Sequence, residues 1–454
     1  MTSALSTIRH CLEGAIPGII ATCDREGFPN VSYVSQVHYV DADQVALSFQ
    51  FFNKTRRNML QNPQMTAYVM DPVTTARYRL ALLYLRTETE GPLFQNMKAK
   101  LAGIASHTGM SGVFELKGAD ICRVLEVEAV PGAIGALPAR NNTRNNAPRN
   151  WLSVLRSLGE RMARQLDLAA LFEETLAGLG EEAGISHSMI LMADSPHAKL
   201  YTVATQGYAQ SGVGSEIPFG AGVIGVAAQY CVPIRINHHA AEYGYGQAVR
   251  AAFRGDAQLE TAIPFPGLPQ PHSQLALPVL QGSDLLAVIY VESDQDMGFT
   301  YDDEDALAVL ARLLADAIAR VQWLPDATDR EAGEPPVRSA LPVAGGRPLQ
   351  VRFFAANQSV FLDEEYLIKG VAGAILWRLL ARHAAEQRVD FSNRELRLDP
   401  QLKLPEVDDN LEARLILLRR RLVEKTNALA IVKTGRGRFR LQLNRPVQLI
   451  EQST

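Results

Sequence analysis

Short apolar stretches separated by tight turns fill the first 130 residues of the chain. Some alternate with polar residues and some are continuously apolar, and turns such as Asp24 to Gly27 and Asp41 to Asp43 divide them. Strands at this spacing predict an antiparallel barrel or sandwich. The expected strands cover residues 18–23, 31–40, 44–49, 66–70, 77–86 and 119–129.

One helix is predicted among these strands, from Asn53 to Pro63. Asn53 suits the N-cap position, and the chain must leave the helix before the proline. Lys54, Thr55 and Arg57 lie in its first turn. Cations at a helix N-terminus oppose the helix dipole, whereas a bound phosphate would be favoured by the dipole, the free amides and the cations together. The pattern therefore indicates either a phosphate site or a solvated basic helix start.

The pattern changes after residue 150 to a mixture of helices and longer strands. An amphipathic helix is expected over residues 151–171 and a closing helix over 301–321, with a shorter one over 223–229. This order predicts an α/β sensor domain. The strands between the helices are expected at residues 188–192, 200–204, 232–236, 274–279 and 285–293, with a further short element at 215–218.

The last hundred residues predict strands, three helices and a terminal hairpin. The helices are expected over residues 366–383, 392–399 and 408–425. The strands are expected over residues 351–354 and 359–362, and those of the hairpin over 430–434 and 438–443.

Two segments rich in proline, glycine and polar residues, 131–150 and 324–348, have no regular apolar periodicity and are predicted linkers. They divide the chain into domains at 1–130, 151–323 and 349–454, so the expected fold class is multidomain α+β.

No apolar run is long enough for a membrane span, which needs about 18 residues. The four cysteines are dispersed without metal-type spacing, which predicts reduced thiols, a cytoplasmic location and no metal site.

Charge is unevenly distributed between the domains. The whole chain has a net charge of −4, but residues 349–454 hold 18 Lys and Arg against 13 Asp and Glu. The last domain therefore has a net charge of +5, whereas the rest of the chain has a net charge of −9. This asymmetry favours an anionic partner for the C-terminal domain.

The order of strands around "SFQFFNKTRRNMLQNP" resembles the pyridoxamine-phosphate-oxidase-like FMN-binding split barrel, over residues 10–130. The resemblance implies that Asn53, Lys54, Thr55 and Arg57 hold the FMN phosphate. It also implies a homodimer with FMN at its two-fold interface. The residues expected along the isoalloxazine ring are Ser32, Val34, Ser35 and Gln36 on one side and Ser48 and Phe49 on the other.

This block departs from the family's vitamin B6 oxidases. It lacks their tryptophan-containing barrel end and their Arg-x-His tail, so true pyridoxamine-phosphate oxidation is not expected. A haem-binding branch of the same fold needs an axial ligand, for which His10, His38 and His107 are the candidates. FMN is the expected cofactor and haem the alternative.

The middle block resembles a GAF domain over residues 151–322, through "GSEIPFGAGVIGVAA", "VPIRIN", "SQLALPVL" and "LLAVIYVES". GAF domains often bind a small molecule between the sheet and a covering loop. Here that loop would be residues 238–268. The adjacent His238 and His239 are not expected to form a metal pair, and Cys231 is expected to be structural.

The last block resembles the winged-helix effector domain of response regulators, over residues 350–445. In that family the third helix enters the major groove of duplex DNA and the hairpin contacts its backbone. The residues that correspond are Asn410 and Arg414 in the helix, and Lys433, Arg436, Arg438 and Arg440 in the hairpin. Acidic residues at the start of the third helix oppose DNA, so a protein-contacting domain is the alternative.

Two functions follow from these resemblances. The first is an FMN-binding redox or small-molecule sensor that regulates transcription through a C-terminal winged helix. The second is an FMN-dependent oxidoreductase acting on a small molecule, with the other domains serving regulation or dimerisation. The sequence shows no acid–base constellation, and the flavin itself would carry the redox chemistry.

Overall fold

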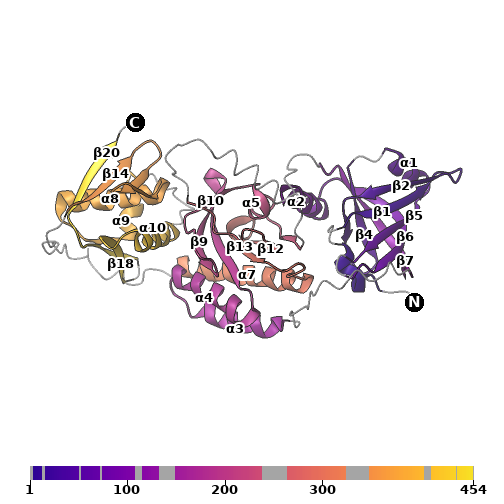
Figure 1. Cartoon of the computed structure of the whole chain (residues 1–454), viewed down its shortest axis with the longest axis horizontal. Coiled ribbons are helices and arrows are strands. Elements are labelled where there is room, and N and C mark those ends of the chain that lie inside the picture. The colour runs from indigo at the N-terminus through magenta and orange to yellow at the C-terminus, as the bar shows by residue number, and fades with distance from the viewer. Residues whose placement is uncertain are drawn as a thin grey trace.

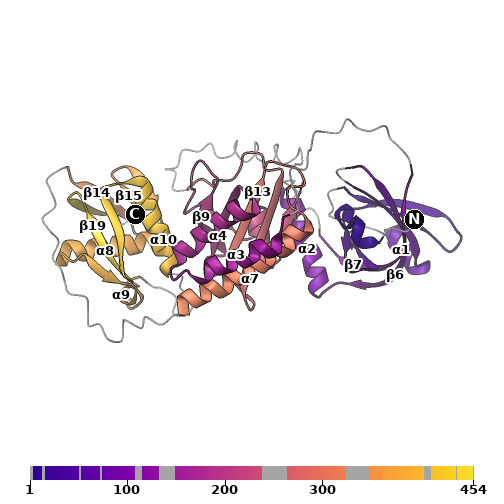
Figure 2. The ribbon, with the colours of Figure 1, turned by 90° about the horizontal axis from the view of Figure 1, so that it is seen from below.

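The computed structural model describes residues 4–12, 16–50, 53–71, 74–107, 115–131, 149–237, 263–323, 347–402, 411–435 and 437–452. These residues form three bodies in a row, with the N-terminal β-body and the C-terminal body at opposite ends (Figures 1 and 2). No helix within the described ranges is long and apolar enough to cross a membrane.

The N-terminal body is a seven-stranded antiparallel sheet of order β2-β1-β5-β6-β7-β4-β3. Its outermost strands, β2 and β3, are separated in sequence by only Ser35 and Gln36. That linker reaches about 11 Å at most, so the sheet must curl until its two edges approach each other. This fits the predicted split barrel. The strands are β1 (Gly18–Cys23), β2 (Pro29–Val34), β3 (Val37–Tyr39), β4 (Gln44–Phe49), β5 (Gln64–Met70), β6 (Arg77–Glu88) and β7 (Gly118–Ala129).

The prediction of one strand over residues 31–40 was wrong. The chain leaves one edge of the sheet after Val34 and joins the other edge at Val37. Strict alternation breaks where Val34 follows Tyr33 and Gln36 follows Ser35, but this short irregularity does not by itself show that the two halves join opposite edges. The other elements of this body are a 3₁₀ helix (Leu5–Leu12), α1 (Asn53–Gln61) and α2 (Pro92–His107).

The middle body is built on an antiparallel sheet of order β10-β9-β8-β13-β12-β11. The strands are β8 (His187–Asp194), β9 (Lys199–Gln206), β10 (Glu216–Pro218), β11 (Ile234–Ile236), β12 (Ser273–Gln281) and β13 (Asp284–Ser293). The helices are α3 (Trp151–Ala163), α4 (Leu168–Ala183), α5 (Gly222–Tyr230) and α7 (Tyr301–Trp323).

The single helix predicted over residues 151–171 is two helices. Asp167 begins the second one, since its carboxylate accepts hydrogen bonds from the backbone N–H groups of Ala169 and Ala170. An aspartate at this position satisfies amides that a helix start otherwise leaves unpaired. The amphipathic period runs through the break, so only the cap distinguishes the two helices.

One face of the six-stranded sheet of the middle body is covered by α5 and by α2 of the barrel. Ala99 of α2 is fully buried in one apolar cluster with residues of α5, β8, β11, β12 and β13. Glu304 of α7 accepts a hydrogen bond from Arg235 at 2.7 Å and pairs with Lys100 of α2 at 3.8 Å. The barrel is therefore attached to the middle body by both apolar packing and buried charge.

At Gly103, α2 lies in close contact with the middle body. A Cβ added there would lie 2.6 Å from Cγ2 of Ile234 in β11, whereas one added at Gly159 of α3 would meet nothing nearer than 4.0 Å. We expect Gly159→Ala to stabilise the protein by about 0.5–1 kcal/mol. We expect Gly103→Ala to be less stable than that control by about 1–3 kcal/mol, because overpacking offsets the gain in helix propensity. Equal denaturant midpoints for the two variants would contradict this.

The C-terminal body contains two sheets, of order β16-β15-β14-β20 and β17-β19-β18. Its strands are β14 (Leu349–Phe354), β15 (Ser359–Leu362), β16 (Glu365–Ile368), β17 (Asp390–Ser392), β18 (Leu429–Gly435), β19 (Arg438–Leu443) and β20 (Val447–Gln452). Its helices are α8 (Gly370–Glu386), α9 (Asn393–Arg397) and α10 (Leu411–Lys425).

The first helix of this body begins later than predicted. Residues 365–368 form β16, which pairs with β15 through a turn at Asp363, where φ is +53°. The helix then starts at Gly370, whose φ of +66° suits glycine. Strand β20 was not predicted; it pairs in parallel with β14 and joins the two ends of the body.

Asp399, which follows α9, is a buried carboxylate of the C-terminal body. Its side chain is inaccessible to solvent and accepts hydrogen bonds from Arg378 at 2.6 Å and Arg382 at 2.8 Å, both in α8. Burial alone would raise the pKa of Asp399. The hydrogen bonds from Arg378 and from the Gln401 N–H, with the two positive charges, instead hold it below its ordinary value.

We expect Asp399→Asn to lower the opening free energy of α8 amides by about 1–3 kcal/mol at pH 7. Because the folded pKa is depressed, the carboxylate stabilises above its unfolded pKa of about 3.9, and that stabilisation is lost as pH falls through the folded value. The difference between wild type and variant should therefore vanish in strong acid. Native-state hydrogen exchange at pH 7, 5 and 3 measures it, and a difference independent of pH would contradict the ion-pair origin.

Candidate functional site

Helix α1 is fixed to the barrel by a small polar network. Asn30 and Ser32 alternate along β2 with the exposed Val31 and Tyr33. Asn30 Nδ2 donates to Thr55 Oγ1 at 2.9 Å, and the Ser32 and Thr55 hydroxyls lie 3.0 Å apart. Thr55 is buried, so its hydroxyl holds the first turn of α1 against β2.

Lys54 and Arg57 lie on the exposed side of the same turn. Three residues apart in a helix, they share one face, beside the unpaired amides of the helix start. Neither cation forms an ion pair within the described ranges, and the side chain of Asn53 lies outside them. This turn therefore offers two uncompensated positive charges and the positive end of the helix dipole to an anion.

Arg56 is a site residue that the sequence reasoning missed. It turns inward, donates to Asp120 Oδ1 at 2.9 Å and lies 4.3 Å from the centre of the Phe49 ring. Asp120 also accepts a hydrogen bond from Thr87. Burial raises the pKa of Asp120, and the contacts with Thr87 and Arg56 only partly oppose that shift. The available signal was Asp120 itself, an acid between the apolar residues Ala119 and Ile121 of β7.

A pocket of about 270 Å³ lies between α1 and the barrel strands. It brings together three of the predicted residues, Val34, Ser48 and Thr55, with Arg56 and Asp120. The volume of about 270 Å³ includes space open to solvent, so the chain alone encloses much less than the roughly 300–1,000 Å³ that is usual for a ligand pocket. The remaining lining residues are Ile20, Leu47 and Met59.

Two buried glutamine atoms near this pocket lack partners. The Gln36 N–H donates to Ser48 Oγ at 3.1 Å, but Gln36 Oε1 has no hydrogen bond within the described ranges. Gln50 Nε2, one residue after the end of β4, also has no hydrogen bond within the described ranges. A buried unpaired polar atom costs about 1–3 kcal/mol, so each of these two atoms is a candidate for a hydrogen bond with a bound group. Ser35 and Phe49, also predicted, are partly buried nearby in sequence.

His10 and His38, two of the three histidines considered as haem ligands, do not line this pocket. His10 Nε2 is 3.2 Å from Asp71 Oδ2, and none of the residues that line the pocket is a histidine. Burial, and then the charge of Lys100 at the contact with the middle body, lower the pKa of His38 to about 3. The side chain of His107 lies outside the described residues.

Three of the cations predicted to contact DNA pair within the protein. Arg414 donates to Asp194 at 2.9 Å and lies 4.6 Å from the centre of the Tyr201 ring. Lys433 pairs with Asp167, and Arg440 makes two hydrogen bonds to Asp390, at 2.7 and 3.1 Å. Arg438 is partly exposed, while Asn410 and Arg436 lie outside the described residues.

The middle body contains a buried polar cluster around Glu292, on the sheet face that α5 covers. Glu292 accepts hydrogen bonds from the Tyr290 hydroxyl at 2.9 Å and from the Leu268 N–H at 2.8 Å. Burial raises the pKa of Glu292, and these hydrogen bonds only partly oppose it. Of the predicted covering loop, residues 238–262 lie outside the described residues. Cys231 is partly buried and its thiol donates to Ala228 O at 3.6 Å.

Comparison with known families identifies two of the three bodies. Residues 5–108 match the family described as pyridoxamine 5'-phosphate oxidase. Residues 165–319 match the GAF domain. The chain thus joins a pyridoxamine 5'-phosphate oxidase-like domain to a GAF domain. No curated protein matches the sequence significantly.

Solved structures similar to parts of the chain include an FMN-binding protein from Syntrophomonas wolfei, 17% identical over 28% of this chain and 86% of that one, with a TM-score of 0.24. Free methionine-R-sulfoxide reductase from Neisseria meningitidis is 19% identical over 38% of this chain and 90% of its own, with a TM-score of 0.30. The GAF domain of a phosphoenolpyruvate-protein phosphotransferase from Coxiella burnetii is 22% identical over 38% and 95%, with a TM-score of 0.31.

Proposed function

We propose that the oxidase-like domain binds FMN and that the chain is a flavin-dependent sensor. The observation that carries this proposal is the first turn of α1, where Lys54 and Arg57 lack anionic partners within the described ranges, beside the buried Thr55. A phosphate there would satisfy both cations and the helix-start amides. The match to a family named for a phosphate-bearing substrate supports the same assignment.

The neighbouring residues have separate expected roles. Gln36 Oε1 and Gln50 Nε2 would complete their hydrogen bonding on the polar edge of a flavin ring. Ser32, Val34 and Ser48 would orient that ring from β2 and β4. FMN, when bound, supplies hydride or single-electron chemistry.

We propose that the site is completed by a second copy of the chain. The pocket within one chain is smaller than a cofactor requires. Beside it, edge strand β2 and its preceding turn expose Phe28, Val31 and Tyr33 at 62%, 65% and 72%. An apolar stripe on an unpaired strand edge is typical of an association surface. A homodimer would cover the stripe and close the pocket.

We propose that the C-terminal body is a winged-helix domain that contacts duplex DNA. The order α8, β17, α9, α10 and the β18–β19 hairpin, with β17 paired to β19, supports this assignment. So do the basic charge of this part of the chain and the cations of the hairpin. In this proposal the flavin and GAF domains sense and the C-terminal domain regulates transcription.

An FMN-dependent oxidoreductase is the second candidate, and Asp120 is the observation that favours it. A carboxyl with a raised pKa that lines the proposed flavin pocket would hold a proton at Oδ2, since Oδ1 accepts hydrogen bonds from Arg56 and Thr87, for transfer to a small substrate. The domains that follow would then regulate the reaction or hold the dimer together.

Two measurements on the purified protein test the proposal. Flavin absorbance that is released on denaturation, and its recovery on titration with FMN, would support the cofactor; failure to bind FMN would refute it. Mobility-shift assays with duplex DNA across a salt series would show binding whose log–log slope falls by about one when a phosphate-binding cation is replaced by alanine. Turnover of small-molecule substrates without any DNA binding would favour the oxidoreductase.

A further inference from the structure

Four acidic residues of the GAF domain face the C-terminal body, and we name them the acidic face. Each pairs with a different cation of that body. The pairs are Asp194 with Arg414 at 2.9 Å, Glu173 with Arg420 at 2.6 Å, Glu216 with Lys369 at 3.1 Å, and Asp167 with Lys433. The four pairs include two cations of α10 and one of the hairpin, the elements proposed to contact DNA.

The innermost of these pairs is buried. The side chains of Asp194 and Arg414 are 6% and 15% exposed, and Arg414 also lies against the Tyr201 ring. Burial alone would raise the pKa of Asp194, but hydrogen bonds from His197 and Arg414 hold it below its ordinary value. Arg420 donates in addition to the Val203 carbonyl of β9 at 2.7 Å. The contact is therefore specific in geometry as well as in charge.

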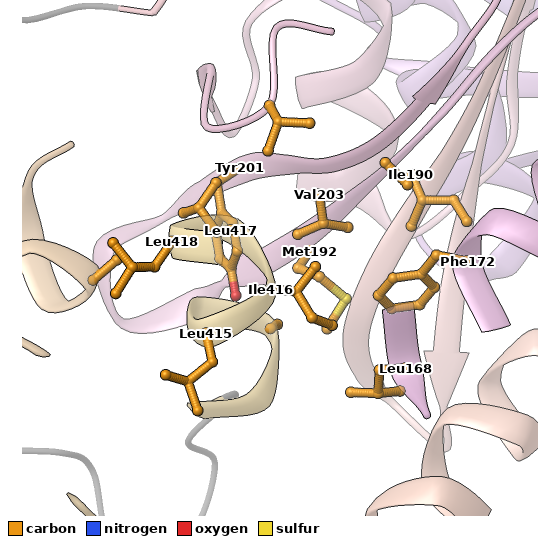
Figure 3. Packing of buried hydrophobic residues seen from close by; sticks show 14 of the residues in the cluster. Leu168, Phe172, Ile190, Met192, Tyr201, Val203, Leu415, Ile416, Leu417 and Leu418 are labelled. Carbon is orange, nitrogen blue, oxygen red and sulfur yellow. The ribbon is translucent and has the colours of Figure 1, made fainter. Parts of the chain in front are cut away.

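Apolar residues of both bodies form one continuous core beneath the ion pairs. Figure 3 shows Ile416 and Leu417 of α10 directed toward Met192, Tyr201 and Val203 of the GAF sheet. The fit is close, since a Cβ added at Gly214 of the GAF domain would lie 3.2 Å from Cδ1 of Leu417. Helix α10 is thus held on the GAF domain by a packed face, and Figures 1 and 2 show this helix lying beside that domain.

We propose that the acidic face takes the place of DNA phosphates, so that α10 and the hairpin bind either the GAF domain or duplex DNA. This inference rests on the proposed DNA contact. Arg414 and Lys433 belong to both sets of contacts, and while Arg414 is buried against Asp194 and the Tyr201 ring its guanidinium is closed to a DNA phosphate. The apparent DNA affinity is then the intrinsic affinity multiplied by the fraction of molecules in which α10 has left the acidic face.

The test uses the full chain with three acids neutralised, Asp167→Asn, Glu173→Gln and Asp194→Asn. The control, Glu26→Gln, Glu90→Gln and Glu126→Gln, makes the same charge change at exposed barrel positions. Two quantities are measured for each: hydrogen exchange of the α10 amides, and affinity for a duplex DNA probe at fixed salt. We expect the first variant alone to exchange faster in α10 and to bind DNA about 10- to 100-fold more tightly than wild type.

Each other outcome overturns the inference in a distinguishable way. Equal, measurable DNA affinity in all three proteins would refute competition and leave DNA binding standing. Faster α10 exchange with no DNA binding by any protein would refute the DNA contact, and the competition with it. Unchanged α10 exchange in the first variant would mean that the acids do not hold the helix.

Discussion

Replacing Lys54 and Arg57 together with alanine is expected to weaken FMN binding by at least about 100-fold. Each cation would contribute a charge-assisted hydrogen bond to the phosphate, worth about 1.5–3 kcal/mol, and 1.4 kcal/mol corresponds to a factor of ten. The fold should survive, because both side chains are exposed and form no ion pair within the described ranges. Fluorescence titration with FMN measures the loss.

The matched control for this prediction is Arg86→Ala with Arg123→Ala. These two cations are also exposed on the barrel, and they pair with Glu88 and Asp43 away from the pocket. The control changes net charge equally and should retain FMN. If the two double variants bind FMN with the same affinity, the phosphate is held somewhere other than the start of α1.

Reversing the charge of Arg414 is expected to detach α10 from the GAF domain. A glutamate there would face the buried Asp194, and breaking a buried ion pair costs about 3–5 kcal/mol. Amides of α10 that exchange through this opening should therefore exchange at least about 100-fold faster in Arg414→Glu. Adding Asp194→Arg should recover part of the protection, because the pair is restored in the opposite sense.

Arg419→Glu provides the comparison on the same helix. Arg419 is partly exposed and forms no ion pair within the described residues, so the same charge reversal should change exchange little. Similar exchange in Arg414→Glu and Arg419→Glu would mean that helix charge in general, rather than the contact with Asp194, holds α10 in place.

Much of the local structure followed from the sequence, for physical reasons that act over a few residues. Short apolar stretches between turns predicted strands such as β1, β4 and the hairpin, and Asn53 and Pro63 bracketed α1 within two residues of its end. The cations of that helix marked the candidate phosphate site. Two of the three domains, recognised from order and spacing, are confirmed by family matches at residues 5–108 and 165–319.

What the sequence could not determine depended on partners distant in the chain. The split of residues 31–40 follows from closure of the barrel, and the inward turn of Arg56 follows from Asp120, 64 residues away. The pairing of Arg414, a predicted DNA contact, with Asp194, 220 residues away, is set by domain packing. Periodicity and caps report on neighbours within one or two turns. Ion pairs and packed faces between domains arise only when the whole chain is folded.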